Sequence, residues 1–208
     1  NVGVRKAPVK PAAISLMTRL FMQGTKNRSA QVLSEDLDKF AIEFSVEYKL
    51  DYLKFKFVCL NEDFEKALEI FDDVINNTTF EDLEKEKIKL AGEIEADLDS
   101  PNAKVFDNYY KNIYENHIYG YTNTVIYENI NEVTRDDIIN TYNEILSDSN
   151  KVIAFVGDLD NEFVRQKLDE VFSKLPKSSD NLSEIDFPKL VEAKSIEIIQ
   201  SDINQAHI

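Results

Sequence analysis

The chain has 208 residues, enough for one domain or for one domain and the start of another. Hydrophobic residues make up 43% of it and charged residues 30%, which supports a packed core and argues against a disordered chain. Asp and Glu number 39 against 24 Lys and Arg, and the resulting net charge of −15 disfavours nucleic acid and favours basic peptides or protein surfaces as partners.

Cysteine content and hydropathy exclude further classes. Cys59 is the only cysteine, so neither a disulfide nor a cysteine-based zinc site can form within one chain. Its position in a strand-like stretch predicts a buried, inert thiol. No run of about 18 apolar residues is present, so no membrane span is expected, and no signal peptide is recognisable. The compartment stays open, with the cytoplasm favoured over the periplasm for a soluble protein.

The first part of the chain predicts two helices and a β-hairpin. Helices are expected over residues 11–22 and 29–40, because apolar residues recur there with helical spacing and turn residues follow. Residues 42–50 and 51–60 alternate between apolar and polar with period two. They predict two antiparallel strands joined by a tight turn.

Two further helices are expected over residues 61–77 and 80–99. Asn61 is the expected N-cap of the first. The second is rich in acids, and four apolar positions are expected to face the core: Ile88, Leu90, Ile94 and Leu98.

The next part predicts two helices separated by a connection. Pro101 starts a helix over residues 101–116, since proline is tolerated in the first helical turn. Residues 117–133 are polar and rich in tyrosine, which predicts a connection without regular structure. Thr134 is the expected N-cap of a helix over residues 134–147, whose first-turn acids suit the helix dipole.

Residues 150–160 predict a buried strand ending in a Gly-Asp turn, and a helix is expected to follow up to Pro176. The chain is therefore interpreted as one complete α+β domain over residues 1–176, with a mixed or antiparallel sheet packed against several helices. A linker is expected over residues 177–190, and the first strands of a second, truncated subdomain over residues 191–208.

Five local motifs occur in the order typical of one family. They are LFMQGTKNRS, EKEKIKLAGEIEADLDSP, HIYGYTNTVIYENINEVTRDDIINTYNEIL, NKVIAFVGDLDNEFVRQKLDEVFSKLP and INQAHI. Together they resemble the insulinase/pitrilysin family of zinc metallopeptidases, which includes the mitochondrial processing peptidases. The resemblance covers nearly the whole chain. It implies the α+β fold of a metallopeptidase half, followed by the start of a similar subdomain.

The resemblance also implies where the chemistry would lie. In the family, the first helix carries His-x-x-Glu-His: the two histidines bind zinc, and the glutamate between them is the general base. A glutamate on a later helix completes the metal site. The positions that match the motif here hold other residues: Ser15, Leu16, Met17, Thr18 and Arg19. Glu93 matches the distal glutamate and Glu86 its helix neighbour, so the carboxylates remain while both histidines and the base are gone.

Ser15, Thr18 and Arg19 fall on one helix face. A carboxylate left opposite them without a metal would be costly or would take up a proton. We therefore expect Arg19 to replace the charge of the metal by pairing with Glu93 or Glu86; the alternative is that Arg19 points into solvent. A nucleophilic Ser15 is disfavoured because arginine stays protonated and cannot act as its base.

No cofactor is therefore expected in this chain, and zinc is expected in an active partner. The only two histidines do not offer a replacement site. His117 falls in the tyrosine-rich connection, where a structural role is favoured, and His207 falls in the expected last strand.

The resemblance favours a non-catalytic subunit that pairs with an active zinc-peptidase homologue or with a second copy of itself. Such a subunit helps hold an extended, possibly basic peptide. Four residues form the strand that would accept the peptide by strand addition: Phe44, Ser45, Val46 and Glu47. The alternatives are a structural scaffold subunit without a peptidase role, a zinc-dependent endopeptidase in its own right, and an unrelated α+β binding module.

Overall fold

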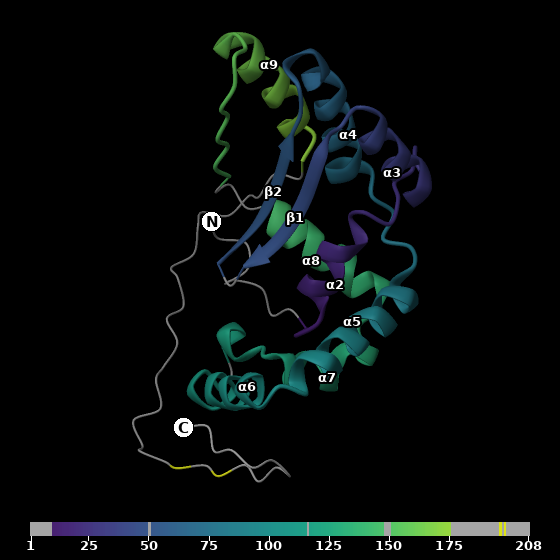
Figure 1. Ribbon diagram of the computed structural model, residues 1–208. Helices are drawn as coiled ribbons and strands as arrows, with labels where there is room; N and C mark the ends of the chain where they lie inside the picture. The colour runs from purple at the N-terminus through teal and green to yellow at the C-terminus, as the bar shows by residue number, and fades with distance from the viewer. Residues whose placement is uncertain are drawn as a thin grey trace.

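The computed structural model describes residues 10–49, 51–115, 117–147 and 151–175, together with residues 196 and 198. These residues form an α+β arrangement in which helices surround one two-stranded sheet (Figure 1). The α-helices are α2 (Ala13–Leu20), α3 (Ala30–Lys39), α4 (Phe64–Asn77), α5 (Leu83–Leu98), α6 (Pro101–Ile113), α7 (Asn123–Asn129), α8 (Arg135–Ser147) and α9 (Asn161–Phe172). Short 3-10 turns cover Asn61–Asp63, Ile118–Gly120 and Ile130–Glu132.

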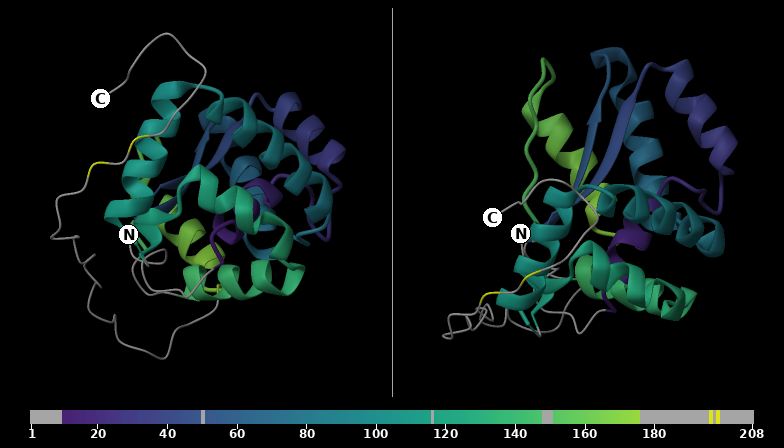
Figure 2. Two further views of the ribbon diagram at one scale, coloured as in Figure 1. Left: turned by 90° about the horizontal axis from the view of Figure 1, so that it is seen from below. Right: turned by 60° about the horizontal axis from the view of Figure 1, so that its bottom comes forward.

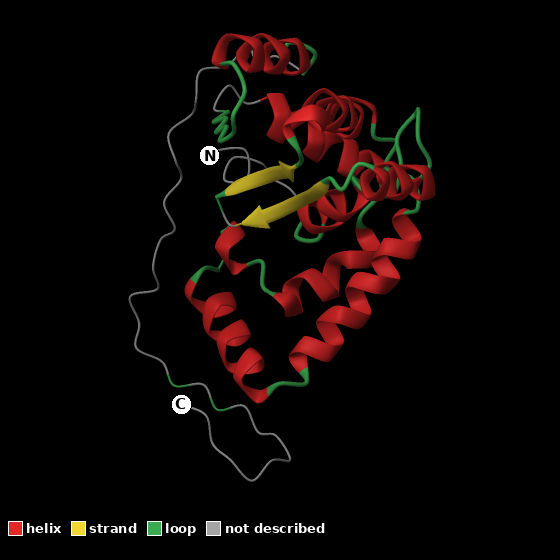
Figure 3. Cartoon of the chain, turned by 45° about the horizontal axis from the view of Figure 1, so that its top comes forward, coloured by secondary structure: helices red, strands yellow, loops and turns green. Residues whose placement is uncertain are grey.

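The sheet is the expected hairpin of β1 (Glu43–Lys49) and β2 (Tyr52–Val58). The strands pair antiparallel from Glu43 opposite Val58 to Lys49 opposite Tyr52 (Figure 3). The period-two pattern is confirmed, because alternate side chains of each strand pack against the core: Phe44, Val46, Tyr48, Leu53, Phe55 and Phe57.

Helix α2 lies in the interior of the molecule, where Figure 2 shows it in purple among the other elements. It packs against α8, α5 and β1. Its apolar side chains are buried: Ala13, Ile14, Leu16, Met17 and Leu20. Its polar side chains are half-buried and form one stripe: Ser15, Thr18 and Arg19. A helix that is apolar on most of its circumference is suited to this central position.

Of the two predicted N-caps, Thr134 is confirmed and Asn61 is not, while Ser29 provides one that was not predicted. The Ser29 side chain accepts from the amide of Val32 at the start of α3, at 3.3 Å. Thr134 Oγ1 accepts from the amide of Asp137 at 3.2 Å, as expected of an N-cap. Asn61 does not cap α4. It lies in the 3-10 turn before the helix, and its side-chain amide donates to the carbonyl of Asp158 at 3.1 Å.

Two other expectations about helices were wrong. Ile88 is 76% exposed, because α5 buries Glu86 and Lys87 instead; of the four expected core positions only Ile94 is fully buried. The tyrosine-rich connection over residues 117–133 contains α7 and two 3-10 turns, and Ile118, Ile126 and Ile130 anchor it to the core.

The predicted buried strand over residues 150–160 is not present in the described part, residues 151–160. This segment forms no ladder with β1 or β2. Phe155 and Leu159 pack against the core, but most of its other apolar side chains are exposed. Val152 is 78% and Val156 98% exposed. Cys59, expected to be buried, is only partly so.

The expected division into domains remains a prediction. The linker over residues 177–190 lies outside the described residues, as does the subdomain start over residues 191–208 except for Ile196 and Ile198. His207 also lies outside them. Within the described ranges, no helix combines the length and the apolarity that a membrane crossing requires.

Asp137 offers a test of how the start of α8 is held. Its Oδ2 accepts from Lys10 Nζ (2.8 Å) and from the amide and hydroxyl of Thr134 (2.8 and 2.7 Å). These bonds, that of Lys10 foremost, lower the pKa of Asp137 from 3.8 to about 2. A lowered pKa stabilises the folded state above the ordinary pKa, and this stability is lost as the pH falls through about 4 toward 2.

We therefore expect Asp137→Asn to lower the free energy of unfolding at pH 7 by about 1 kcal/mol or less, since the partners are accessible to water. The deficit should vanish near pH 2, as measured by urea unfolding at both pH values. Asp136→Asn, the same charge change in the same turn, is the control. A deficit that is equal at both pH values would contradict this assignment.

Candidate functional site

The Gly-Thr turn after α2 is built around Thr25. Gly24 has φ +127°, and a Cβ there would lie 3.2 Å from the carbonyl oxygen of Arg28. The Thr25 hydroxyl accepts from the amides of Asn27 and Arg28 at 3.1 and 3.0 Å, and it donates to Asp73 Oδ2 at 2.7 Å. The turn is thereby attached to α4, on which Asp73 lies.

Asp73 is buried among polar partners. Arg28 Nη1 donates to its Oδ2 at 2.6 Å, while the side-chain amides of Asn27 and Asn77 donate to its Oδ1 at 2.5 and 3.1 Å. Burial raises the pKa of Asp73, but the bonds from Thr25, Arg28, Asn27 and Asn77 outweigh it, so the pKa is lowered.

Arg28 uses its remaining donors on the side chains of Asp36 (3.0 Å) and Glu69. Burial lowers its pKa, but the bonds to Asp36, Asp73 and Glu69 outweigh this effect and raise the pKa. The basic residue after the turn is therefore a structural tie between α3 and α4. The sequence analysis missed this network; the signal was Asp73, an acid among the apolar positions of the predicted helix 61–77.

The second polar cluster joins α2 to α5 and contains the positions that match the zinc motif. Arg19 Nε donates to Glu86 Oε2 at 3.0 Å. Its Nη1 and Nη2 donate to the two oxygens of Glu93 at 2.9 and 2.8 Å. Arg19 was expected to pair with Glu93 or Glu86, and it pairs with both. It thereby forms a bridge between α2 and the two glutamates of α5.

The three members of this bridge differ in burial. The Glu86 side chain is 2% exposed, that of Arg19 26% and that of Glu93 61%. The other oxygen of Glu86 accepts from Lys89 Nζ at 2.6 Å, so the buried carboxylate has two cationic partners. The hydrogen bond between Arg19 and Glu93 is the largest cause of a raised pKa of Arg19 and a lowered pKa of Glu93. Both groups are therefore held in their charged forms.

Ser15 and Thr18 complete the predicted face but do not join the bridge by any of the hydrogen bonds observed. The Thr18 hydroxyl donates to the carbonyl of Ile14 one turn earlier in α2, at 2.8 Å. Ser15 is half-buried on the same helix. Neither side chain has the chemistry of a general base at neutral pH.

This donor set does not fit zinc. Protein zinc sites use cysteine, histidine and carboxylate donors, and the group between Glu86 and Glu93 is a guanidinium, which offers no lone pair. No cluster of three or more His, Cys, Asp or Glu side chains suited to a metal ion occurs among the residues that the structure describes. His117 lies elsewhere: its Nδ1 accepts from the amide of Tyr119 at 3.2 Å, and its ring contacts those of Tyr114 and Tyr119.

The predicted peptide-binding residues lie on β1, on the hairpin rather than on the Arg19 bridge. Phe44 and Val46 pack against the core, while Ser45 and Glu47 occupy the alternate positions. Glu47 pairs with Lys54 across the hairpin at 3.3 Å. Among the described residues β1 has β2 as its only strand neighbour, so its other edge carries backbone groups without a ladder.

Comparison with known proteins identifies the family of the chain. The sequence profile described as "Insulinase (Peptidase family M16)" matches residues 2–124, and that described as "Peptidase M16 inactive domain" matches residues 132–208. The mitochondrial-processing peptidase subunit beta of Neurospora crassa is 24% identical over 90% of this chain and 39% of its own length. An uncharacterized zinc protease of Rickettsia bellii is 23% identical over 84% of this chain and 43% of its own length.

Solved structures agree on the fold. The peptidase M16 inactive domain from Pseudomonas fluorescens superimposes with a TM-score of 0.81 at 20% identity, over 90% of this chain and 46% of that one. A protease from Helicobacter pylori gives a TM-score of 0.78 at 19% identity, over 92% and 47%. The fold is therefore that of peptidase M16 domains. The chain belongs to the insulinase family, peptidase family M16, and spans less than half the length of the curated relatives described above.

Removing the Arg19 charge tests the bridge. Arg19→Met keeps much of the stem but leaves Glu86 buried with Lys89 as its only cationic partner among the contacts described above. We expect a loss of about 1–3 kcal/mol in the free energy of unfolding, the usual cost of depriving a buried charge of a partner. Glu93→Gln is the matched control, because its side chain is mostly exposed. It should cost under about 1 kcal/mol. Equal losses in urea unfolding of the two variants would contradict a buried role for the Arg19–Glu86 pair.

Proposed function

We propose that this chain is a non-catalytic member of the insulinase family that binds extended peptides and supports an active zinc-peptidase partner. One observation carries the proposal: the Arg19 guanidinium spans Glu86 and Glu93 at 2.8 to 3.0 Å, where the family places a metal. The site retains the carboxylates and the helix packing. It lacks the donors and the base that hydrolysis requires.

The argument against catalysis rests on the chemistry of the side chains. Arginine remains protonated at all working pH values, so Arg19 can neither ligate zinc nor accept a proton from water. Thr18, at the position of the base, donates its hydroxyl hydrogen to a backbone carbonyl. A zinc ion entering this site would have to displace a cation that is covalently part of α2. Zinc is therefore proposed to be bound by the partner and not by this chain.

The free edge of β1 supports the peptide-binding part of the proposal. An extended peptide added along Phe44, Ser45, Val46 and Glu47 would gain main-chain hydrogen bonds with little dependence on its sequence. The net charge of −15 favours basic segments during association. Glu47, which is partly exposed, provides a carboxylate at that strand, and a basic peptide would share it with Lys54.

The partner is proposed to be a family member that carries His-x-x-Glu-His, or a second copy of this chain. The name of one relative, a processing peptidase subunit beta, supports an arrangement of subunits. A scaffold subunit without influence on hydrolysis is the alternative, and a zinc endopeptidase in its own right is a third. The first two differ in their effect on a partner's activity, and the third differs in zinc content.

Zinc content tests the first part of the proposal. After equilibration with zinc and gel filtration, the chain is expected to hold far less than one zinc per molecule by elemental analysis, and to leave an unstructured peptide uncut. The triple variant Ser15→His, Thr18→Glu, Arg19→His is the positive control, since it restores the family's donor pattern. Stoichiometric zinc in the unmodified chain, together with peptide cleavage, would establish an enzyme and overturn the proposal.

A mixing assay tests the role as a subunit. The chain is added to an insulinase-family member that carries His-x-x-Glu-His, from the same genome, and hydrolysis of a basic peptide is followed for each protein alone and for the mixture. We expect hydrolysis to rise on mixing, with zinc in the partner alone. A stable complex without any change in hydrolysis would instead assign the chain to the scaffold class.

Peptide binding by strand addition has its own test. Alternate amides of an added strand point toward the accepting edge, so N-methylation of one parity of residues should abolish binding and that of the other parity should not. Loss of about three hydrogen bonds is expected to weaken binding by about tenfold or more. The measurement is fluorescence anisotropy of a labelled basic peptide. Equal binding by both N-methylated peptides would exclude main-chain pairing with β1.

A further inference from the structure

The end of β1 adjoins a cluster of tyrosines around one carboxylate. Asp51, in the turn after β1, accepts a hydrogen bond from the hydroxyl of Tyr119, which lies in the 3-10 turn beside the hairpin (Figure 3). The Tyr119 ring contacts that of Tyr114 edge to face, at 5.5 Å between centroids. Tyr48 and Tyr121 pack against the core. All five side chains are half-buried, so this tyrosine cluster borders the surface.

The surroundings of Tyr48 are electrically negative. Its pKa is raised to about 12, first by burial and then by the nearby Tyr121, Asp51 and Tyr119. A carboxylate forms strong, charge-assisted hydrogen bonds with ammonium and guanidinium groups. Aromatic rings attract the same groups through their negative faces. A carboxylate set among tyrosine rings therefore suits the side chain of a lysine or an arginine.

The register of the hairpin identifies the residues of β1 that face its free edge. Two residues separate Lys49 from Tyr52, so the hairpin closes on a hydrogen-bonded pair. Such pairs alternate along β1, and the residues between them direct their N–H and C=O groups away from β2: Phe44, Val46 and Tyr48. A peptide added to β1 would therefore pair with Tyr48 at the end of the strand that adjoins the tyrosine cluster.

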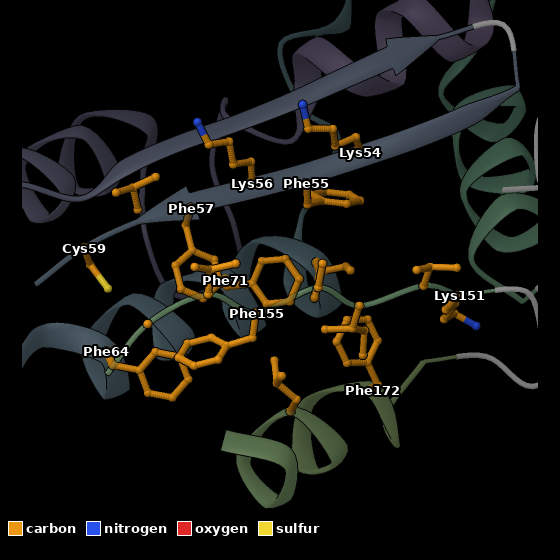
Figure 4. Close-up of a pocket in the computed structure, with 18 of the residues that line it drawn as sticks. Lys54, Phe55, Lys56, Phe57, Cys59, Phe64, Phe71, Lys151, Phe155 and Phe172 are labelled. Atoms are coloured by element: carbon orange, nitrogen blue, oxygen red, sulfur yellow. The ribbon is translucent and has the colours of Figure 1, made fainter. Parts of the chain in front are cut away.

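The side chains of an added strand follow the two faces of the hairpin. Figure 4 shows these faces on β2: Phe55 and Phe57 point into the cavity beside the strand, and Lys54 and Lys56 point away from it. Tyr48 packs on the core side. A peptide residue opposite Tyr48 has its side chain on that same side, with its Cβ about 5 Å from that of Tyr48. A long side chain at this position is therefore directed to the tyrosine cluster.

We propose that the tyrosine cluster binds the side chain of one arginine or lysine of the peptide held on β1. Asp51 pairs with the cation, and the rings of Tyr48, Tyr119 and Tyr121 surround the side chain. The bond from Tyr119 orients the carboxylate, whose about four acceptor sites can serve more than one donor. Occupation of the site requires a peptide along β1, so it rests on the function proposed above. It adds a preference at one position to main-chain bonds that have little dependence on sequence.

Glu47 is less suited to this selection. It lies at the alternate position of β1, on the face away from Tyr48, and it pairs with Lys54 at 3.3 Å. A peptide cation at Glu47 would have to share the carboxylate with that lysine, and both side chains are partly exposed, which weakens the pair. Asp51, held among half-buried rings, offers a less solvated partner.

A matched pair of labelled peptides tests the site. One has a single arginine and no other charged side chain; the other has citrulline there, which keeps the shape of arginine without its charge. We expect the unmodified chain to bind the arginine peptide about tenfold more tightly in fluorescence anisotropy, the scale of a charge-assisted hydrogen bond. Asp51→Asn should reduce this preference to about twofold or less and leave the affinity for the citrulline peptide unchanged. Glu43→Gln removes the same charge at the other end of β1 and should retain the preference.

The outcomes separate this site from the function on which it rests. Binding of neither peptide to the unmodified chain would overturn the proposed peptide binding and the site with it. Equal binding of both peptides would overturn the site alone. A preference for arginine that Asp51→Asn leaves intact would do the same.

Nuclear magnetic resonance of the unmodified chain decides the matter even if Asp51→Asn does not fold. Tyr119 and Tyr121 lie outside β1, so main-chain pairing alone does not bring a peptide to their rings. The arginine peptide is expected to shift their ring resonances, and the citrulline peptide to shift them much less. Ring resonances that respond equally to both peptides would contradict binding of the cation in the tyrosine cluster.

Discussion

Glu86 imposes the constraint on which the arrangement of α2 and α5 depends. Its carboxylate is 2% exposed, and a charge removed from water to that extent requires cationic or hydrogen-bonding partners. Arg19 supplies one from α2, and Lys89 another from within α5. Because the Arg19 bonds cross between the helices, they fix the rotation of α2 about its axis as well as its distance from α5. A metal ion between these helices would meet the same electrostatic requirement, but arginine meets it without offering a coordination site for a water molecule.

The turn after α2 repeats this arrangement with another acid. Asp73 on α4 is buried, and its carboxylate accepts hydrogen bonds from the side chains of Arg28, Thr25, Asn27 and Asn77. A second arginine, in the turn that follows α2, thus neutralises a second buried carboxylate. The apolar faces of α2 would permit several orientations, since they cover most of its circumference. The two polar clusters select one of them, because any other would leave a carboxylate buried without partners. Loss of the zinc motif thus leaves the mechanical role of this region intact.

Much of this was accessible from the sequence, and the failures have identifiable physical causes. The resemblance to the family placed Arg19 opposite Glu86 and Glu93, and the cost of a buried, unpaired charge then predicted that they pair. The prediction that Ile88 faces the core was wrong, because apolar spacing does not reveal that a polar residue such as Glu86 is buried through its ion pairs. The predicted strand over residues 150–160 was wrong because a strand requires a hydrogen-bonded neighbour, and the local sequence pattern does not show whether one is present. The Asp73 network was missed because its members are far apart in the sequence.

The hairpin has two edges, and the structure gives them different chemistry. The side of β2 borders a cavity lined by phenylalanines, which favours an apolar neighbour. The β1 edge carries Ser45 and the partly exposed Glu47 at alternate positions, which suits an exchangeable and basic partner. A partner at the β1 edge would therefore meet unpaired backbone groups beside a polar face, whereas one at the β2 side would meet the rings of phenylalanines.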